Sequence, residues 1–82
     1  MQRLNIMERL IGEMNAGVEE ERQIELDEEA AIELASKKID LRELIAATRA
    51  AYVSAIRDGS RLAKPFIKKG REKIAFGFIP KN

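Results

Sequence analysis

The side chains best suited to chemistry in this chain are basic, and they gather late in the sequence. Between positions 61 and 73 lie six of them: Arg61, Lys64, Lys68, Lys69, Arg71 and Lys73. Lys and Arg neutralise phosphates and release their counterions, which gives affinity for nucleic acid that does not depend on base sequence. Phe66, Phe76 and Phe78 could stack on unpaired bases. The pattern predicts a nucleic-acid surface in which these six residues contact phosphates.

A purely structural interpretation of the same segment stays open. Aromatic side chains usually belong to a core, and runs of charge usually face solvent. The phenylalanines would then be buried, and the lysines would be solvated or paired with the acidic first half of the chain. A membrane-surface helix is disfavoured, because Asp58, Gly59, Pro65 and Gly70 interrupt any continuous amphipathic helix.

Residue types that commonly carry catalysis are scarce. The 82 residues include no His and no Cys, so the commonest general base, the most nucleophilic side chain and the usual zinc ligands are missing. None of the Ser and Thr residues follows a nucleophile-elbow pattern, and the five glycines are too scattered for a phosphate-cradling loop. We therefore expect a binding protein, not an enzyme, with neither cofactor nor metal.

Three glutamates at four-residue intervals could form a cation site. Glu25, Glu29 and Glu33 would share one side of a helix, but Mg²⁺ and Ca²⁺ usually take more oxygen ligands from a shaped loop. A solvent-facing stripe is therefore favoured. Like charges at this spacing destabilise a helix slightly unless opposite charges offset them. The basic C-terminal half, of the same chain or of a neighbour, is the expected source of those charges.

Charge divides the chain into two halves. Residues 1–40 carry 5 basic and 11 acidic side chains, a net charge of −6, whereas residues 41–82 carry 10 basic and 3 acidic ones, a net charge of +7. A single domain of this length has a marginal core, so we expect a homo-oligomer, a dimer or larger. No apolar run approaches the roughly 20 residues that span a bilayer, and we expect a cytoplasmic protein with no membrane partner.

Periodicity and capping residues predict three helices, over residues 3–15, 28–38 and 41–57. Asp27 is the expected N-cap of the second, and Asp40 with Glu43 has the spacing of a capping box for the third. Alternation predicts short strands at 23–26 and 73–79, and a helical turn is expected over 65–69. The fold class is mostly α, a three-helix domain with one or two short strands, or α+β if those strands pair.

The first helix carries a narrow apolar stripe of Leu4, Met7, Ile11 and Met14. Two interpretations of this stripe have equal weight. It packs on the chain's own core, or it forms the seam of a dimer. Two heptads cannot define a coiled coil, so the sequence does not choose between them.

The order of strand 23–26 and the two helices after it loosely resembles the ribbon-helix-helix family of dimeric DNA-binding repressors. The resemblance covers about 36 residues, and it implies that Gln23 and Glu25 enter the major groove. The family's longer first helix and small-residue turn are missing here, and Glu25 would face DNA phosphates unfavourably.

Two function classes therefore remain. The first is a small regulatory protein, acting on transcription, that contacts nucleic acid through its basic half. The second is a protein-binding inhibitor or adaptor, such as a phage-type antirepressor or host-factor antagonist. Its interface anchors would be apolar, with Phe76, Phe78 and Ile79 as candidates.

Overall fold

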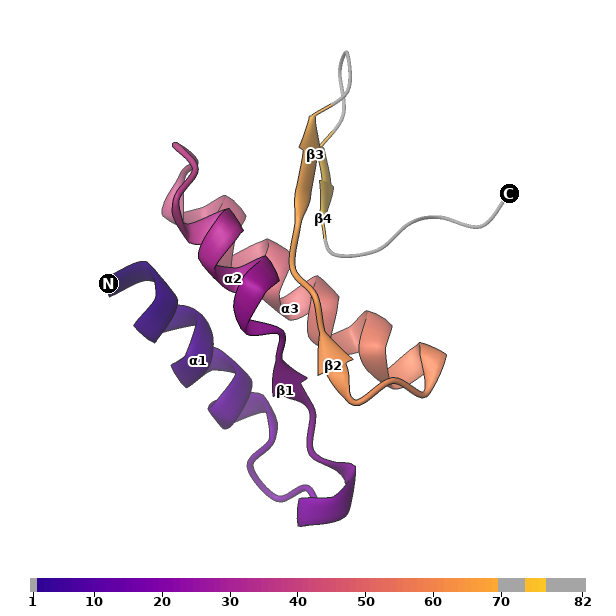
Figure 1. Cartoon of the computed structure of the whole chain (residues 1–82). Helices are drawn as coiled ribbons and strands as arrows, with labels where there is room; N and C mark the ends of the chain where they lie inside the picture. Colours follow the sequence, from indigo (N-terminus) through magenta and orange to yellow (C-terminus); the bar gives the residue numbers. More distant parts are fainter. Residues whose placement is uncertain (1, 70–73, 77–82) are drawn as a thin grey trace.

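A computed structural model describes residues 2–69 and 74–76 of the chain, and the side chains of residues 2–67. It is mostly helical, as the sequence predicts, with two small sheets (Figure 1). In chain order the elements are α1 (Gln2–Met14), the 3-10 turn η1 (Glu20–Arg22), β1 (Glu25–Leu26), α2 (Glu28–Ala35), α3 (Leu41–Asp58), β2 (Leu62–Ala63), β3 (Ile67–Lys69) and β4 (Ile74–Phe76).

Local capping sets the limits of the helices. The Asp27 carboxylate accepts a hydrogen bond from the Ala30 amide at 3.0 Å, which confirms the predicted N-cap of α2. The capping box of α3 is also confirmed, because the Asp40 carboxylate accepts from the backbone and the Glu43 carboxylate accepts from the Asp40 amide at 3.2 Å. Gly59 ends α3 with a left-handed φ of 71°.

Helix α2 is shorter than the predicted 28–38 and ends at Ala35. The Ser36 hydroxyl donates to the Glu33 carbonyl at 2.8 Å, which satisfies one of the free carbonyls of the last turn. Beyond it, Ile39 packs against the core outside the helix. The chain makes this apolar contact by leaving the helix before Lys37 and Lys38, the two lysines predicted to close it.

Part of each predicted strand is present, 25–26 of 23–26 as β1 and 74–76 of 73–79 as β4, and the two do not pair with each other. Residues 73 and 77–79 lie outside the described residues. Strand β1 pairs in parallel with β2, through Glu25↔Leu62 and Leu26↔Ala63. Strand β4 pairs antiparallel with β3, through Ile67↔Phe76, Lys68↔Ala75 and Lys69↔Ile74. The helical turn expected over 65–69 is therefore wrong. The φ of proline suits extended backbone as well as a first helical turn, and the ladder to β4 favours the extended form.

The ribbon-helix-helix resemblance does not extend to the strand. Its order of strand, helix, helix is present as β1, α2 and α3. However, β1 pairs with β2 of the same chain, and Gln23 lies outside the strand with its side-chain amide donating to the Val18 carbonyl at 3.0 Å. The two positions that the resemblance directs into a DNA groove are therefore used differently here.

The core consists of two adjoining clusters beneath α1, which packs against both α2 and α3. The first contains Met7, Ala31, Leu34, Leu44, Ala47 and Ile67. The second contains Ile11, Ile24, Ala51, Tyr52, Ala55 and Ala63. Alanines at four-residue spacing along α3 let the neighbouring backbones approach closely, and this is why so small a chain can bury three helices together.

The apolar stripe of α1 packs inside the chain. Met7 and Ile11 are 1% and 5% exposed, and Leu4 and Met14 are partly buried against the two clusters. Of the two interpretations of this stripe, the structure therefore has the one in which it covers the chain's own core. The side chains of Met7 and Ile11 in particular are covered by the same chain.

A buried asparagine ties the loop after α1 to α3. The Asn15 side chain donates to the Ile24 carbonyl at 2.8 Å and accepts from the Ile24 amide at 3.0 Å. The Tyr52 hydroxyl lies 2.9 Å from the same Asn15 oxygen and 3.0 Å from the Met14 carbonyl. This network fixes where the chain enters β1, and hence where β2 and the segment after it leave the helical body.

Candidate nucleic-acid interface

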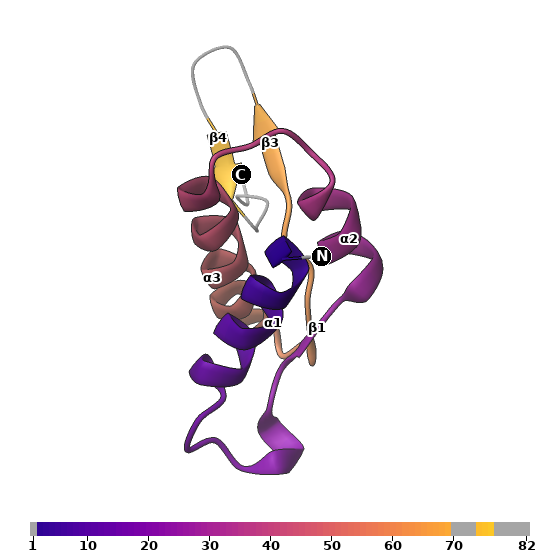
Figure 2. The same cartoon turned by 90° about the vertical axis from the view of Figure 1, so that its left-hand side faces the viewer.

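The β3–β4 ribbon extends away from the three helices. The helices lie below it in Figure 1 and, seen from the side, in Figure 2. Its base is anchored. Pro65 is fully buried, and Ile67, the first residue of β3, is 8% exposed within the first core cluster. Strand β4 contacts α3. The ribbon is therefore attached to the core at one end.

Two of the six predicted phosphate contacts belong to β3, and two more follow it in the sequence before β4. Lys68 and Lys69 are the second and third residues of β3, and in the sequence Arg71 and Lys73 fall between β3 and β4. Arg71 and Lys73, like Phe78 and Ile79, lie outside the described residues. Phe76 is placed by its backbone only, at the end of β4 opposite Ile67.

Arg61 has a structural role that the sequence did not predict. Its Nε donates to the Gln23 carbonyl at 3.1 Å, and its Nη2 lies 3.5 Å from the Glu20 carbonyl. Its own carbonyl accepts from the Glu25 amide at 2.8 Å. Arg61 therefore joins η1 to the start of β2, and its phosphate contact stays a prediction.

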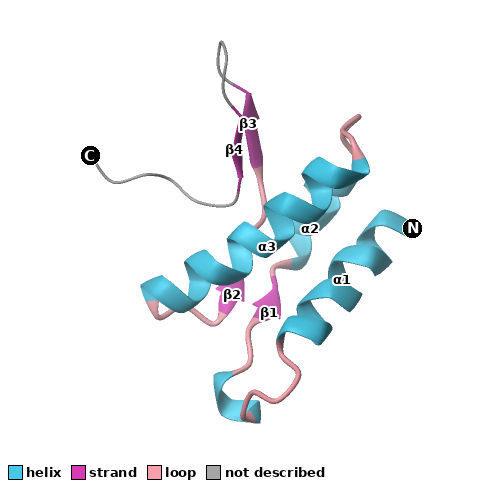
Figure 3. Cartoon of the chain, turned by 180° about the vertical axis from the view of Figure 1, so that it is seen from behind, coloured by secondary structure: helices cyan, strands magenta, loops and turns pink. Residues whose placement is uncertain are grey.

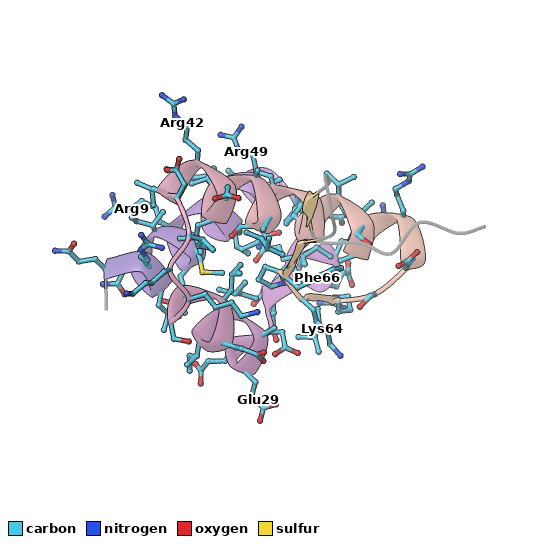
Figure 4. All side chains as sticks on the ribbon, turned by 90° about the horizontal axis from the view of Figure 1, so that it is seen from above. Arg9, Glu29, Arg42, Arg49, Lys64 and Phe66 are labelled. Atoms are coloured by element: carbon cyan, nitrogen blue, oxygen red, sulfur yellow. The ribbon has the colours of Figure 1, made fainter. Side chains whose placement is uncertain are left out.

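Lys64 and Phe66 flank the buried Pro65 at the base of the ribbon. Lys64 is exposed, which suits a phosphate contact, whereas Phe66 is half-buried. Figure 4 shows Lys64 on the side of the molecule away from Arg42 and Arg49. A half-buried ring has less free surface on which a base could stack.

Ion pairing inside the chain does not neutralise the basic side chains that the structure describes. Over residues 2–67 a single ion pair is present, between Arg22 and Glu19 at 4.0 Å, and both side chains are largely exposed. Of the two arrangements in the structural interpretation, pairing with the acidic half is therefore not seen over this range, and exposed basic side chains are the other arrangement. Arg9, Arg42, Arg49 and Arg57 are exposed as well.

The three glutamates of the candidate cation site do not form one stripe. Glu25 lies in β1, while Glu29 and Glu33 lie on α2. Among the side chains of residues 2–67 no three acidic groups come close enough together to hold a metal ion. In the same part of the chain, no helix is long and apolar enough to cross a membrane.

The sequence predicted only half of the ribbon. The alternation of Ile74, Phe76 and Phe78 indicates β4, but β3 lies where a helical turn was expected. A usable signal was present, since a short run at 66–69 and a second at 73–76 flank Gly70 at the spacing of a hairpin.

Comparison with known proteins finds no match to any family model, curated protein or solved structure.

Proposed function

We propose that this protein is a non-catalytic regulator that binds double-stranded nucleic acid through the β3–β4 ribbon. One observation carries the proposal: a two-stranded ribbon extends from a helical body and bears Lys68 and Lys69, with Arg71 and Lys73 between its strands in the sequence. The major groove of B-form DNA is wide enough to admit a two-stranded β-ribbon. Basic residues on such a ribbon can reach phosphates on either side of the groove.

The residues of the proposed interface divide into those that contact phosphates and those that hold the ribbon in place. Lys64, Lys68, Lys69, Arg71 and Lys73 supply the positive charge. The buried Pro65 and Ile67 hold the ribbon on the core, and Arg61 holds β2 against the loop that precedes β1. Phosphate contacts of this kind give affinity and orientation but little discrimination between sequences. Broad binding to duplexes is therefore expected.

Fluorescence anisotropy with labelled mixed-sequence duplex DNA, duplex RNA and single strands, each at low and physiological salt, tests the proposal. We expect duplex binding that weakens steeply with salt. The variant K68A/K69A/R71A/K73A should lose it. A matched control, R9A/R22A/K37A/K38A, removes the same charge from exposed positions on α1, η1 and the turn after α2, and it should bind nearly as the parent does.

Two results would contradict the proposal. One is no binding to any nucleic acid at low salt, and the other is equal loss in the ribbon variant and its control. The rival function, a protein-binding inhibitor or adaptor, would then come first. Affinity capture with the intact protein, with Phe76, Phe78 and Ile79 as the residues to substitute, would be the appropriate next experiment.

A further inference from the structure

Two exposed faces of opposite charge lie on different helices. The acidic face is the outer side of α2 and consists of Glu28, Glu29, Ile32 and Glu33. The arginine face is the outer side of α3 and consists of Arg42, Arg49, Val53 and Ile56. In α3 the intervals of seven, four and three residues place these side chains along one line of the helix.

The two faces cannot neutralise each other within one copy. Figure 4 shows Glu29 pointing away from the molecule on the side opposite Arg42 and Arg49. Figure 3 shows α3 in front of α2 when the molecule is seen from behind, so that the helical body separates them. No ion pair connects the faces among the side chains of residues 2–67. Like charges at positions 29 and 33 destabilise α2 slightly unless opposite charges offset them, and a second molecule can supply those charges.

Each face also has exposed apolar side chains next to its charged ones. Ile32 is 41% exposed between the glutamates, and Val53 and Ile56 are 48% and 57% exposed beyond Arg49. Apolar side chains bordered by charge are typical of protein interfaces. They argue against a phosphate backbone as the ligand of the arginine face, since two large apolar side chains would meet the phosphates there.

We propose that the acidic face of one copy docks on the arginine face of a second copy. Ile32 would lie against Val53 and Ile56, while a glutamate beside Ile32 approaches Arg49. Arg42 lies about 16 Å from Val53 along the helix and adds attraction at longer range. Apolar contact supplies most of the affinity, and the charges set the orientation and exclude docking of like faces. The interface uses neither the ribbon nor the core stripe of α1, and so it is independent of the nucleic-acid proposal.

The geometry fixes the kind of assembly. Since the two faces are different and lie on opposite sides, the contact is head-to-tail, and every added copy leaves one face of each kind free. Such an interface generates a ring or an open chain and not a closed two-fold dimer.

Sedimentation velocity of the intact protein over a wide concentration range, in the absence of nucleic acid, tests this. The mean mass should rise steadily with concentration and fall when salt is added. The variants R42E/R49E and E29R/E33R should each remain monomeric. An equimolar mixture of the two should assemble again, because the reversed α3 of one then faces the reversed α2 of the other. A control, E13R/E21R, reverses two exposed glutamates outside both faces and should assemble as the parent does.

A parent protein that stays monomeric at every concentration overturns the inference. So does assembly that persists in both reversal variants, or a mixture that fails to regain it. Circular dichroism checks that the variants remain helical, and the milder E29Q/E33Q, which should weaken assembly without abolishing it, serves if a reversal variant unfolds. Duplex binding by monomeric R42E/R49E, measured separately, keeps failure of this interface distinct from failure of the ribbon proposal.

Discussion

The hydroxyl of Tyr52 lies 2.9 Å from the side-chain oxygen of Asn15, across 37 residues of chain. That oxygen also accepts the Ile24 amide, and the Asn15 side-chain nitrogen donates to the Ile24 carbonyl. One asparagine, 9% exposed, therefore satisfies both backbone groups of a buried residue and binds α3 at the same time. The position of β1 depends on this arrangement.

Removing either partner should lower stability, by unequal amounts. Tyr52→Phe keeps the ring and deletes one hydrogen-bonding group, so we expect the free energy of unfolding to fall by about 1 kcal/mol. Asn15→Ala leaves the Ile24 amide and carbonyl buried without partners, and a loss of roughly 2–4 kcal/mol is expected. Urea denaturation followed by circular dichroism measures both. Equal losses in the two variants would show that Asn15 does not hold the network together.

Two glycines provide a matched pair of substitutions with opposite expected signs. Gly59 has a φ of 71°, and a Cβ there would meet nothing within 4 Å, so Gly59→Ala should destabilise by about 1 kcal/mol through backbone conformation alone. Gly12 lies within α1 with equally open space around it. Gly12→Ala should stabilise by about 0.5–1 kcal/mol, because alanine restricts the unfolded chain and favours helix. Thermal unfolding of both variants beside the parent tests the pair, and a stabilising Gly59→Ala would contradict it.

The capping box of α3 should be measurable in the same way. Asp40→Ala removes the acceptor of the Arg42 amide at 3.2 Å, and we expect a loss of roughly 0.5–2 kcal/mol. Asp40→Asn keeps an accepting oxygen and should retain most of the stability. If Asn and Ala cost the same, the cap would act through charge at the helix terminus and not through its hydrogen bond.

The sequence predicted the features that depend on near neighbours. The three helices follow from apolar spacing and from caps such as Asp27 and Asp40, whose partners lie within three residues. What it missed depends on distant partners. Strand β2 has two residues and hence no period, and it exists because Glu25 and Leu26 lie beside it. Strand β3 needs β4, and the position of Asn15 beside Tyr52 needs the whole helical body.

The candidate site shows the same division. Its charge is a property of composition, and therefore the concentration of Lys and Arg after position 60 was evident from the chain alone. The role of Arg61 was not, because its two acceptor carbonyls lie 38 and 41 residues away. Nothing in the residue types near Arg61 distinguishes an arginine that braces a loop from one that contacts phosphate.

This distinction gives the sharpest comparison between two basic positions of the segment. Arg61→Ala removes the hydrogen bonds to the Gln23 and Glu20 carbonyls, so it should lower the free energy of unfolding. The loss should be less than about 1 kcal/mol, because the side chain is exposed. The salt dependence of duplex binding should stay unchanged. The double variant Lys68→Ala/Lys69→Ala should leave the free energy of unfolding unchanged. It should reduce the slope of log K against log salt by about 2, roughly one for each phosphate that is no longer neutralised. Denaturation and salt titration on the same preparations give both quantities. A reduced slope in the Arg61 variant would place this residue in the phosphate-binding set, and an unchanged slope in the double variant would remove β3 from the interface.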